Sequence, residues 1–308
     1  MENIAQNFED SLKFQDLPNG EILAYRSRIH STPTKSNLVL LHGWISSSLT
    51  IWDDLVTLLS DLPINIYALD LRGFGDSSYN KSIISIKDFA EDVHLFVKKL
   101  NLSKIVIAGY SMGGAIALQY AASYPDSLER LISFNGVGCQ GIKTYYEQDG
   151  KQIQIVKSED FGKSPFWGPV EFKWSNNIAG AIAFQNFGTF NSGKKIDPIR
   201  IEKYVQGGIF KERHVVDVLY WITHFNISKE SNGVVEGTGE IANIKCQCLF
   251  IHTDNDALLS AKDHAEYTTS VLGKSVAKLE MIENSGHCAF MSNPEKTAEV
   301  VKEFLKEL

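Results

Sequence analysis

Short runs of apolar, mostly β-branched residues recur along the chain and predict buried strands. They lack the strict alternation of a strand that has one face in water, and this is typical of a parallel sheet covered on both faces. The runs are residues 37–41, 64–69, 104–108, 130–134, 246–251 and 277–282.

Between these runs, apolar residues repeat at the spacing of a helix. Residues 51–59 and 89–100 each place their apolar side chains on one helical face, and Ser-Ile-Lys-Asp at 85–88 predicts a capping box in front of the second segment. Asn293-Pro294 opens a last helix, since proline is favoured in a first turn. Strands that alternate with helices predict an α/β domain.

The regular alternation stops near Gly138 and resumes near Ile241. We therefore predict a core of residues 1–137 and 241–308 with an insertion of helices and loops at 138–240. Helical periodicity is present from about 197 to 225, and three glycines within 231–239 predict a flexible return to the core. Aromatic residues are frequent in the insertion: Tyr145, Tyr146, Phe161, Phe166, Trp167, Phe172, Trp174, Phe184, Phe187 and Phe190.

Composition narrows the class of protein. With 308 residues, 44% of them apolar, the chain can bury the core of one large domain. A net charge of −7 without basic runs argues against nucleic acid as a partner. An acidic N-terminus and no apolar stretch near the roughly 18 residues of a membrane span predict a soluble, cytoplasmic protein. Four irregularly spaced cysteines predict reduced, mostly buried thiols: Cys139, Cys246, Cys248 and Cys288.

The strongest chemical motif is Gly-Tyr-Ser-Met-Gly-Gly at residues 109–114. It follows the predicted strand 104–108 and precedes a helical run at 115–124. A nucleophile elbow needs this strand-turn-helix context, because its turn is so tight that only small residues fit two positions before and after the serine. Ser111 is therefore the predicted nucleophile, at a helix N-terminus that favours an oxyanion.

A serine hydroxyl needs a base to take its proton and an acid to orient that base. Nucleophile-elbow enzymes place the acid and then the histidine after the serine, each beyond a later strand. Here Asp254 and Asp256 follow the predicted strand 246–251, and His287 follows the predicted strand 277–282. His287 is the predicted base, and the residues alone leave both aspartates as candidates for the acid.

Together these motifs resemble those of the α/β-hydrolase superfamily, in its cap-bearing serine esterase and lactonase-like branch. The resemblance implies a mostly parallel eight-stranded sheet flanked by helices, in which residues 21–26 belong to an antiparallel edge and the insertion is a helical cap. Five ordered motifs carry it: Leu-Leu-His-Gly-Trp at 40–44, Asp-Leu-Arg-Gly-Phe-Gly-Asp-Ser at 70–77, the elbow, the aspartate loop and Ser-Gly-His at 285–287.

The same resemblance implies roles for further residues. The backbone N–H groups of Trp44 and Met112 would form the oxyanion hole. Because His287 stands at the position of the family's base, His42 is expected to shape its own loop. Some relatives carry the acid directly after the strand at 130–134, but Asn135 stands there in this chain.

The family's acid loop usually reads Gly-x-x-Asp followed by proline. This pattern aligns Asp256 with the acid, although Thr253 stands in place of the glycine and Ala257 in place of the proline. We favour Asp256 as the acid and expect Asp254 to cap the loop or to lie in water.

Other interpretations of these polar residues are weaker. His252, Asp254, Asp256 and His264 have the wrong spacing for an EF-hand loop, and we expect no metal and no cofactor. The glycine-rich turn between Asp70 and Asp76 lacks the Lys-Ser/Thr ending of a phosphate loop, and the family uses it as a wall of its substrate site. Cys288 is expected to be a small packing residue.

The sequence thus predicts a serine hydrolase that cleaves a small or medium apolar ester, lactone or thioester through an acyl-enzyme. A carbon–carbon bond hydrolase or a perhydrolase with the same triad is an alternative. A hydrolase-fold ligand receptor with slow turnover is an alternative of another class. Dehalogenases and epoxide hydrolases of the superfamily normally carry Asp at the nucleophile position, so Ser111 argues against both.

Overall fold

One eight-stranded sheet forms the centre of the computed structural model, which describes residues 8, 11–44, 46–164 and 214–306. Its strands are β1 Lys13–Asp16, β2 Ile22–Arg28, β3 Asn37–Leu41, β4 Asn65–Leu69, β5 Ile105–Tyr110, β6 Leu128–Phe134, β9 Gln247–Thr253 and β10 Ala277–Ile282. They lie in the order β1-β2-β4-β3-β5-β6-β9-β10. β2 is antiparallel to both of its neighbours, and every pair from β4 to β10 is parallel.

This architecture confirms the predicted α/β-hydrolase fold, and all six expected runs are strands. The expected antiparallel edge is present and consists of β1 and β2. One detail differs from the expectation. β5 continues to Tyr110 rather than ending at Ala108, so the strand leads directly into Ser111.

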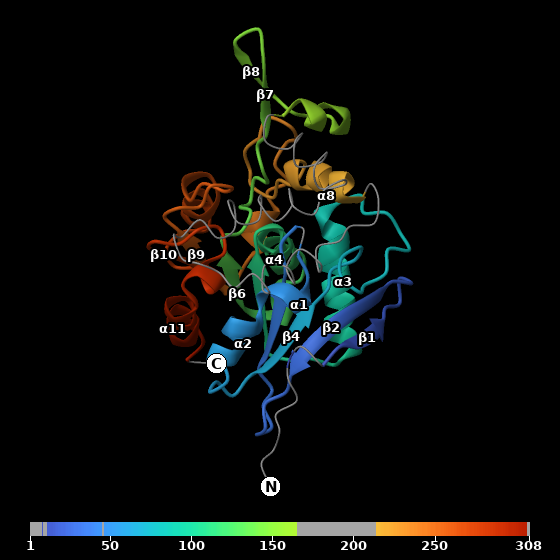
Figure 1. The fold of residues 1–308 in the computed structure, drawn as a ribbon, viewed down its shortest axis with the longest axis vertical. Coiled ribbons are helices and arrows are strands. Elements are labelled where there is room, and N and C mark those ends of the chain that lie inside the picture. The colour runs from blue at the N-terminus through green and yellow to red at the C-terminus, as the bar shows by residue number, and fades with distance from the viewer. Residues whose placement is uncertain (1–7, 9–10, 45, 165–213, 307–308) are drawn as a thin grey trace.

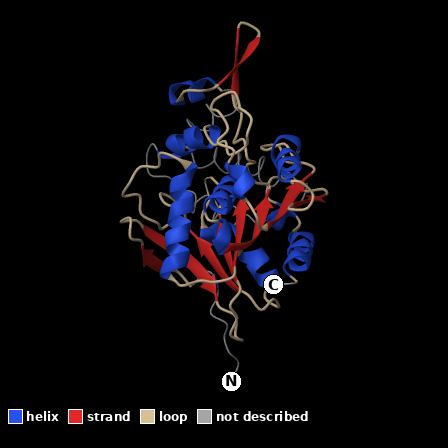
Figure 2. Cartoon of the chain, turned by 180° about the vertical axis from the view of Figure 1, so that it is seen from behind, coloured by secondary structure: helices blue, strands red, loops and turns tan. Residues whose placement is uncertain are grey.

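Helices cover both faces of the sheet, as Figure 2 shows. Side chains alternate along each central strand: Val39 and Leu41 of β3 belong to one buried cluster, while Leu38 and Leu40 belong to the other. The first cluster packs against α3 Ile86–Lys99 and α4 Met112–Ser123. The second packs against α2 Asp53–Leu58, α10 Ala289–Ser292 and α11 Pro294–Leu305. The remaining described α-helices are α1 Ser48–Ile51, α8 His214–Thr223 and α9 Tyr267–Leu272.

Local capping explains where the predicted helices begin. Ser85 accepts a hydrogen bond from Lys87 N at 3.1 Å, and Asp88 accepts one from Ser85 N at 3.0 Å, which completes the expected capping box of α3. α11 begins at Pro294, as the Asn-Pro pair predicts. In the described part of the chain, no helix is long and apolar enough to cross a membrane.

A hairpin interrupts the region that the sequence predicts as helices and loops. β7 Tyr145–Gln148 and β8 Lys151–Gln154 pair antiparallel, and Figure 1 shows them projecting beyond α8. Asp149 and Gly150 connect them with φ of 53° and 74°, and two positive φ values are what a type I′ turn requires. The prediction was wrong at this hairpin, although the Asp-Gly pair was a recognisable signal for it.

The glycine-rich segment 231–239 is also different from its prediction as a flexible return. Asn232 is buried, accepts hydrogen bonds from the N–H groups of Val234 and Val235, and donates to the carbonyl of Gln140. These bonds hold the segment against the region that follows β6. Residues 166–190, with most of the expected aromatic side chains, and the first part of the periodic stretch lie outside the described residues. The domain boundaries stay a prediction.

Candidate active site

The turn between β5 and α4 has the geometry of a nucleophile elbow. Ser111 lies between the last residue of the strand and the first residue of the helix, with φ 51° and ψ −115°. This backbone conformation is sparsely populated for a residue with a side chain and costs about 1–3 kcal/mol. A methyl group at Gly109 would overlap the carbonyl of Gly113, and one at Gly113 would overlap the carbonyl of Leu41. The glycines therefore permit the close backbone approach that presents the serine.

We expect Gly109→Ala to destabilise the protein by about 3 kcal/mol, because the added methyl group forces the strand and the helix apart. Gly162→Ala is the matched control, since a methyl group there meets nothing within 4 Å, and its effect should stay below about 0.5 kcal/mol. Urea unfolding of both variants measures the difference. Equal midpoints for the two variants would contradict the close approach.

The side chains of Ser111, His287 and Asp256 form one continuous chain of hydrogen bonds. Nε2 of His287 lies 3.0 Å from Oγ of Ser111, and Nδ1 of His287 lies 2.8 Å from Oδ2 of Asp256. A carboxylate at Nδ1 selects the tautomer with its proton there, which leaves Nε2 to accept from the serine hydroxyl. The arrangement can therefore move the Ser111 proton to a base that is already oriented.

The two candidate aspartates have different surroundings. Besides His287, Asp256 accepts hydrogen bonds from the N–H groups of Leu258 and Leu259, each at 2.9 Å. Burial opposes the charge of this carboxyl, but His287, His252 and the Leu259 N–H outweigh it and hold the pKa of Asp256 at about 2. Asp256 is thus an ionised partner for the imidazole across the neutral range.

Asp254 faces away from this chain of bonds, toward the loop after β10. Its carboxylate accepts from Asn284 N at 2.9 Å and from Ser285 N at 3.2 Å. It caps that loop, which is one of the two roles expected for it. Its contacts suit a carboxyl that supports the backbone in front of His287.

His42 is placed as a structural residue. It is fully buried, its Nδ1 lies 2.7 Å from the carbonyl of Gly43, and its Nε2 accepts from Leu71 N at 2.9 Å. Burial lowers the pKa of His42, so the ring is neutral and both nitrogens are used. The loop that it shapes runs against the elbow, because a methyl group at Gly43 would lie 2.9 Å from Cβ of Ser111.

Trp44 and Met112, the residues predicted to form the oxyanion hole, directly follow Gly43 and Ser111, which lie against each other. Met112 is the first residue of α4, where an N–H group has no partner within the helix. Trp44 follows His42 and Gly43 after β3. Its half-buried side chain packs against both the first sheet cluster and a small cluster of Ile155, Phe161 and Leu219, and it thereby connects the sheet with residues of the predicted insertion.

Two further histidines lie close to Asp256. Nε2 of His252 is 3.7 Å from Oδ2 of Asp256, while its Nδ1 accepts from Thr253 N at 3.0 Å. Nδ1 of His264 accepts from Gly138 N at 3.1 Å, and burial lowers the pKa of His264 to about 4. Because Nδ1 of His252 and Nδ1 of His264 both accept from the backbone, these side chains are better suited to hydrogen bonding than to metal binding. Among the described residues, no three His, Cys, Asp or Glu side chains are grouped to hold a metal.

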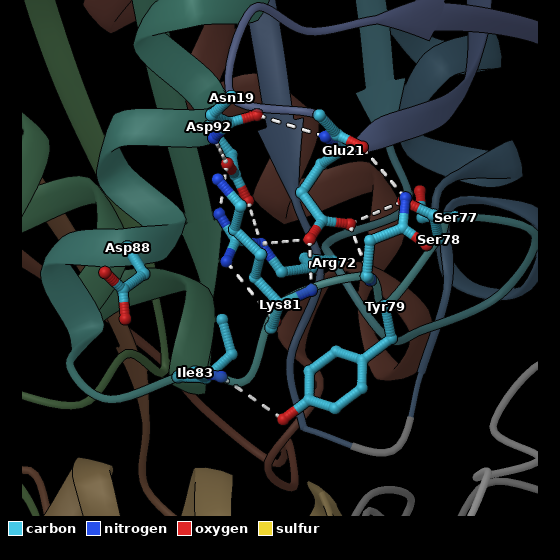
Figure 3. A network of polar contacts seen from close by, with 12 residues as sticks. Asn19, Glu21, Arg72, Ser77, Ser78, Tyr79, Lys81, Ile83, Asp88 and Asp92 are labelled. Atoms are coloured by element: carbon cyan, nitrogen blue, oxygen red, sulfur yellow. Dashed lines mark hydrogen bonds and ion pairs between the residues drawn. The ribbon is translucent and has the colours of Figure 1, made fainter.

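Backbone hydrogen bonds to the Asp70 carboxylate hold the glycine-rich turn after β4, and a buried ion pair adjoins it. Asp70 accepts from Ser48 N at 2.6 Å and from Asp76 N at 3.0 Å, and so closes the turn on itself. Figure 3 shows the adjoining network, in which Arg72 contacts Asp92 at 2.5 Å and Glu21 at 3.7 Å. These contacts give Asp70 a structural role in place of phosphate binding.

All four cysteines are buried and form no disulfide bond, as the sequence predicts. Cys288 directly follows His287 and is fully buried in the second sheet cluster, which fits its predicted role as a small packing residue.

Asn135 and Thr253 are site residues whose contacts sequence reasoning missed. Nδ2 of Asn135 lies 2.9 Å from Oδ2 of Asp256 and 2.7 Å from Oγ1 of Thr253. The signal was their position at the carboxyl ends of β6 and β9, which are neighbours in the sheet. In the sequence, Asn135 shows only that no acid follows the strand at 130–134, and Thr253 is noticeable only because it replaces the glycine of the family's acid loop.

Comparison with known proteins agrees with the fold. The family described as alpha/beta hydrolase fold matches residues 37–154. Monoacylglycerol lipase ABHD6 of Homo sapiens is 23% identical over 278 residues, which cover 88% of this chain and 75% of the lipase. A soluble epoxide hydrolase of Corynebacterium is 33% identical over 111 residues, covering 36% of this chain and 38% of that protein.

Among solved structures, an esterase from Exiguobacterium antarcticum superposes with a TM-score of 0.74 at 18% identity. The match covers 96% of this chain and 99% of the esterase. At this level of identity the likeness establishes the fold, while the chemistry has to be argued from the residues of the site.

Proposed function

From its site and its α/β-hydrolase fold, we propose that the chain is a serine hydrolase of the α/β-hydrolase superfamily that acts on carboxylic esters or related acyl compounds. The observation that carries the proposal is the hydrogen-bonded chain from Ser111 through His287 to Asp256. The base lies 3.0 Å from the nucleophile and 2.8 Å from the orienting acid, which is the arrangement that acyl transfer requires.

In the proposed mechanism, Oγ of Ser111 attacks the acyl carbonyl carbon while His287 takes the hydroxyl proton. The N–H groups of Trp44 and Met112 stabilise the negative oxygen, and such donors are typically worth about 10²–10³ in rate each. His287 then gives its proton to the leaving alcohol or thiol as the acyl-enzyme forms. A water molecule, deprotonated by His287, attacks that ester and releases the acid and Ser111.

We propose that the substrate is small or medium in size and apolar, and that residues 138–240 form the cap above it. Support comes from the described part of this region, where Ile155, Phe161 and Leu219 are buried together and Trp44 packs against them. An apolar acyl group would gain from burial beside such side chains, whereas a charged one would lose its hydration.

A panel of esters and lactones tests this proposal. We expect hydrolysis of butyrate esters at least about tenfold faster than of hemisuccinate esters, which have the same chain length but a charged end. A burst of one alcohol per protein before steady state would reveal the acyl-enzyme. Hydrolysis that is undiminished in Ser111→Ala contradicts the proposal.

The same panel separates the alternatives. A protein that reacts with a fluorophosphonate at Ser111 but cleaves neither esters nor lactones would favour the carbon–carbon bond hydrolase or the perhydrolase. Slow turnover together with ligand-dependent stabilisation of the fold would favour the receptor. The epoxide hydrolase relative does not alter the proposal, since this chain carries serine where that class normally carries aspartate.

A further inference from the structure

Asn135 uses both hydrogens of its amide group within the candidate site. It stands directly after β6, and its Nδ2 donates to Oδ2 of Asp256 and to Oγ1 of Thr253, at 2.9 and 2.7 Å. Oδ2 is also the oxygen that faces His287. Asn135 therefore fixes the direction of the carboxylate oxygen on which the imidazole depends.

Thr253 extends this contact to the loop that carries the base. Its hydroxyl accepts from Asn135 and donates to the carbonyl of Gly286 at 3.0 Å, so both of its hydrogen-bonding roles are in use. Gly286 directly precedes His287. A hydroxyl can make this bridge because it both accepts and donates, whereas the glycine that the family pattern has at 253 could not.

The backbone supports the same arrangement. Asn135 has φ 42°, in the left-handed region that asparagine tolerates better than most residues, and its N–H donates to the carbonyl of Ile251 at 2.8 Å. Asn135 and Thr253 are both buried, and their bonds lie away from bulk water. Buried bonds of this kind are directional and costly to break.

We propose that Asn135 and Thr253 are a pair of positioning residues that hold the loops after β6, β9 and β10 in register, so that Asp256 and His287 stay aligned with Ser111. The expected effect on catalysis rests on the proposed function. The expected effect on the hydrogen bond between His287 and Asp256 does not, because that bond can be observed without turnover.

Thr253→Val and Thr253→Ser form the decisive pair of variants. Valine keeps the shape of the side chain and removes the hydroxyl, whereas serine keeps the hydroxyl. With the best ester of the panel, we expect kcat to fall about tenfold in Thr253→Val with little change in KM, and to stay within about threefold in Thr253→Ser. If serine loses as much as valine, or valine loses nothing, the proposal is overturned.

Asn135→Gly tests the other member, because glycine accepts the positive φ without strain. We expect kcat to fall about 10- to 100-fold, as for a misplaced catalytic group. Combined with Thr253→Val, the loss should be smaller than the product of the two single effects, since both changes break one relay. Fully multiplicative losses would contradict a shared role.

A spectroscopic readout separates this inference from the proposed function. The proton between Nδ1 of His287 and Asp256 should give a low-field ¹H NMR signal in wild type and in Thr253→Ser. It should be shifted or lost in Thr253→Val and Asn135→Gly. If the signal changes as expected but the protein hydrolyses no ester, the proposed function is refuted and the positioning role is upheld. If the variants keep both full activity and an unchanged signal, the positioning role is refuted and the proposed function is upheld.

Discussion

Replacing Ser111 with alanine is expected to lower kcat by about 10⁶-fold, the loss seen when a triad nucleophile is removed. Without Oγ, no acyl-enzyme can form, and only substrate binding and the N–H donors remain to accelerate attack by water. His287→Ala should cost about as much, and the double variant should cost little more than either single one, because the two side chains act in the same proton transfer. Steady-state kinetics of the three variants measures these losses.

Labelling with a fluorophosphonate identifies the nucleophile independently of substrate. The adduct should lie on Ser111 in wild type and be absent in Ser111→Ala. Ser123→Ala is the matched control, since this serine is exposed at the other end of α4 and should keep both labelling and rate. An adduct elsewhere, or labelling that survives in Ser111→Ala, would refute the nucleophile.

Asp256→Asn is expected to lower kcat by about 10⁴-fold, whereas Asp254→Asn should retain activity within about tenfold. An amide nitrogen facing Nδ1 of His287 would favour the tautomer whose proton lies on Nε2, and this tautomer cannot accept the Ser111 proton. Asp254 makes no such contact, because its oxygens accept from the backbone of Asn284 and Ser285. The two substitutions are chemically identical, so each is a control for the other.

Rates and unfolding midpoints should be measured together for this pair. Asp254→Asn removes charge from a backbone cap and should act mainly on stability. Asp256→Asn should lower kcat, which is measured at saturating substrate. An inactive Asp254→Asn beside a near-normal Asp256→Asn would reverse the assignment of the acid.

Features that depend on neighbours in sequence were predictable. The elbow combines a strand, two close-packed glycines and a helix within a few residues, so Ser111 could be chosen from local pattern alone. The long apolar runs likewise located the central strands. Asp256 could be preferred over Asp254 only through a family pattern, since the difference between them lies in which way each carboxylate points.

Features that depend on contacts between distant loops were not predictable. Asn135 and Thr253 meet because β6 and β9 are neighbours in the sheet, although they are 118 positions apart in the chain. Similarly, composition suggested a flexible segment at 231–239, but the buried amide of Asn232 holds it. Local sequence reports propensity, and tertiary hydrogen bonds override it.

The position of β10 at the end of the strand order has a consequence for biosynthesis. Among the described strands it pairs with β9 alone, and it precedes the loop of His287, which lies 176 positions after Ser111. During translation the ribosome therefore releases the serine and its elbow long before the base exists. Under the proposed mechanism, Ser111 of the nascent chain has an ordinary, unactivated hydroxyl, and it becomes a nucleophile only when the last strand joins the sheet and brings His287 beside it.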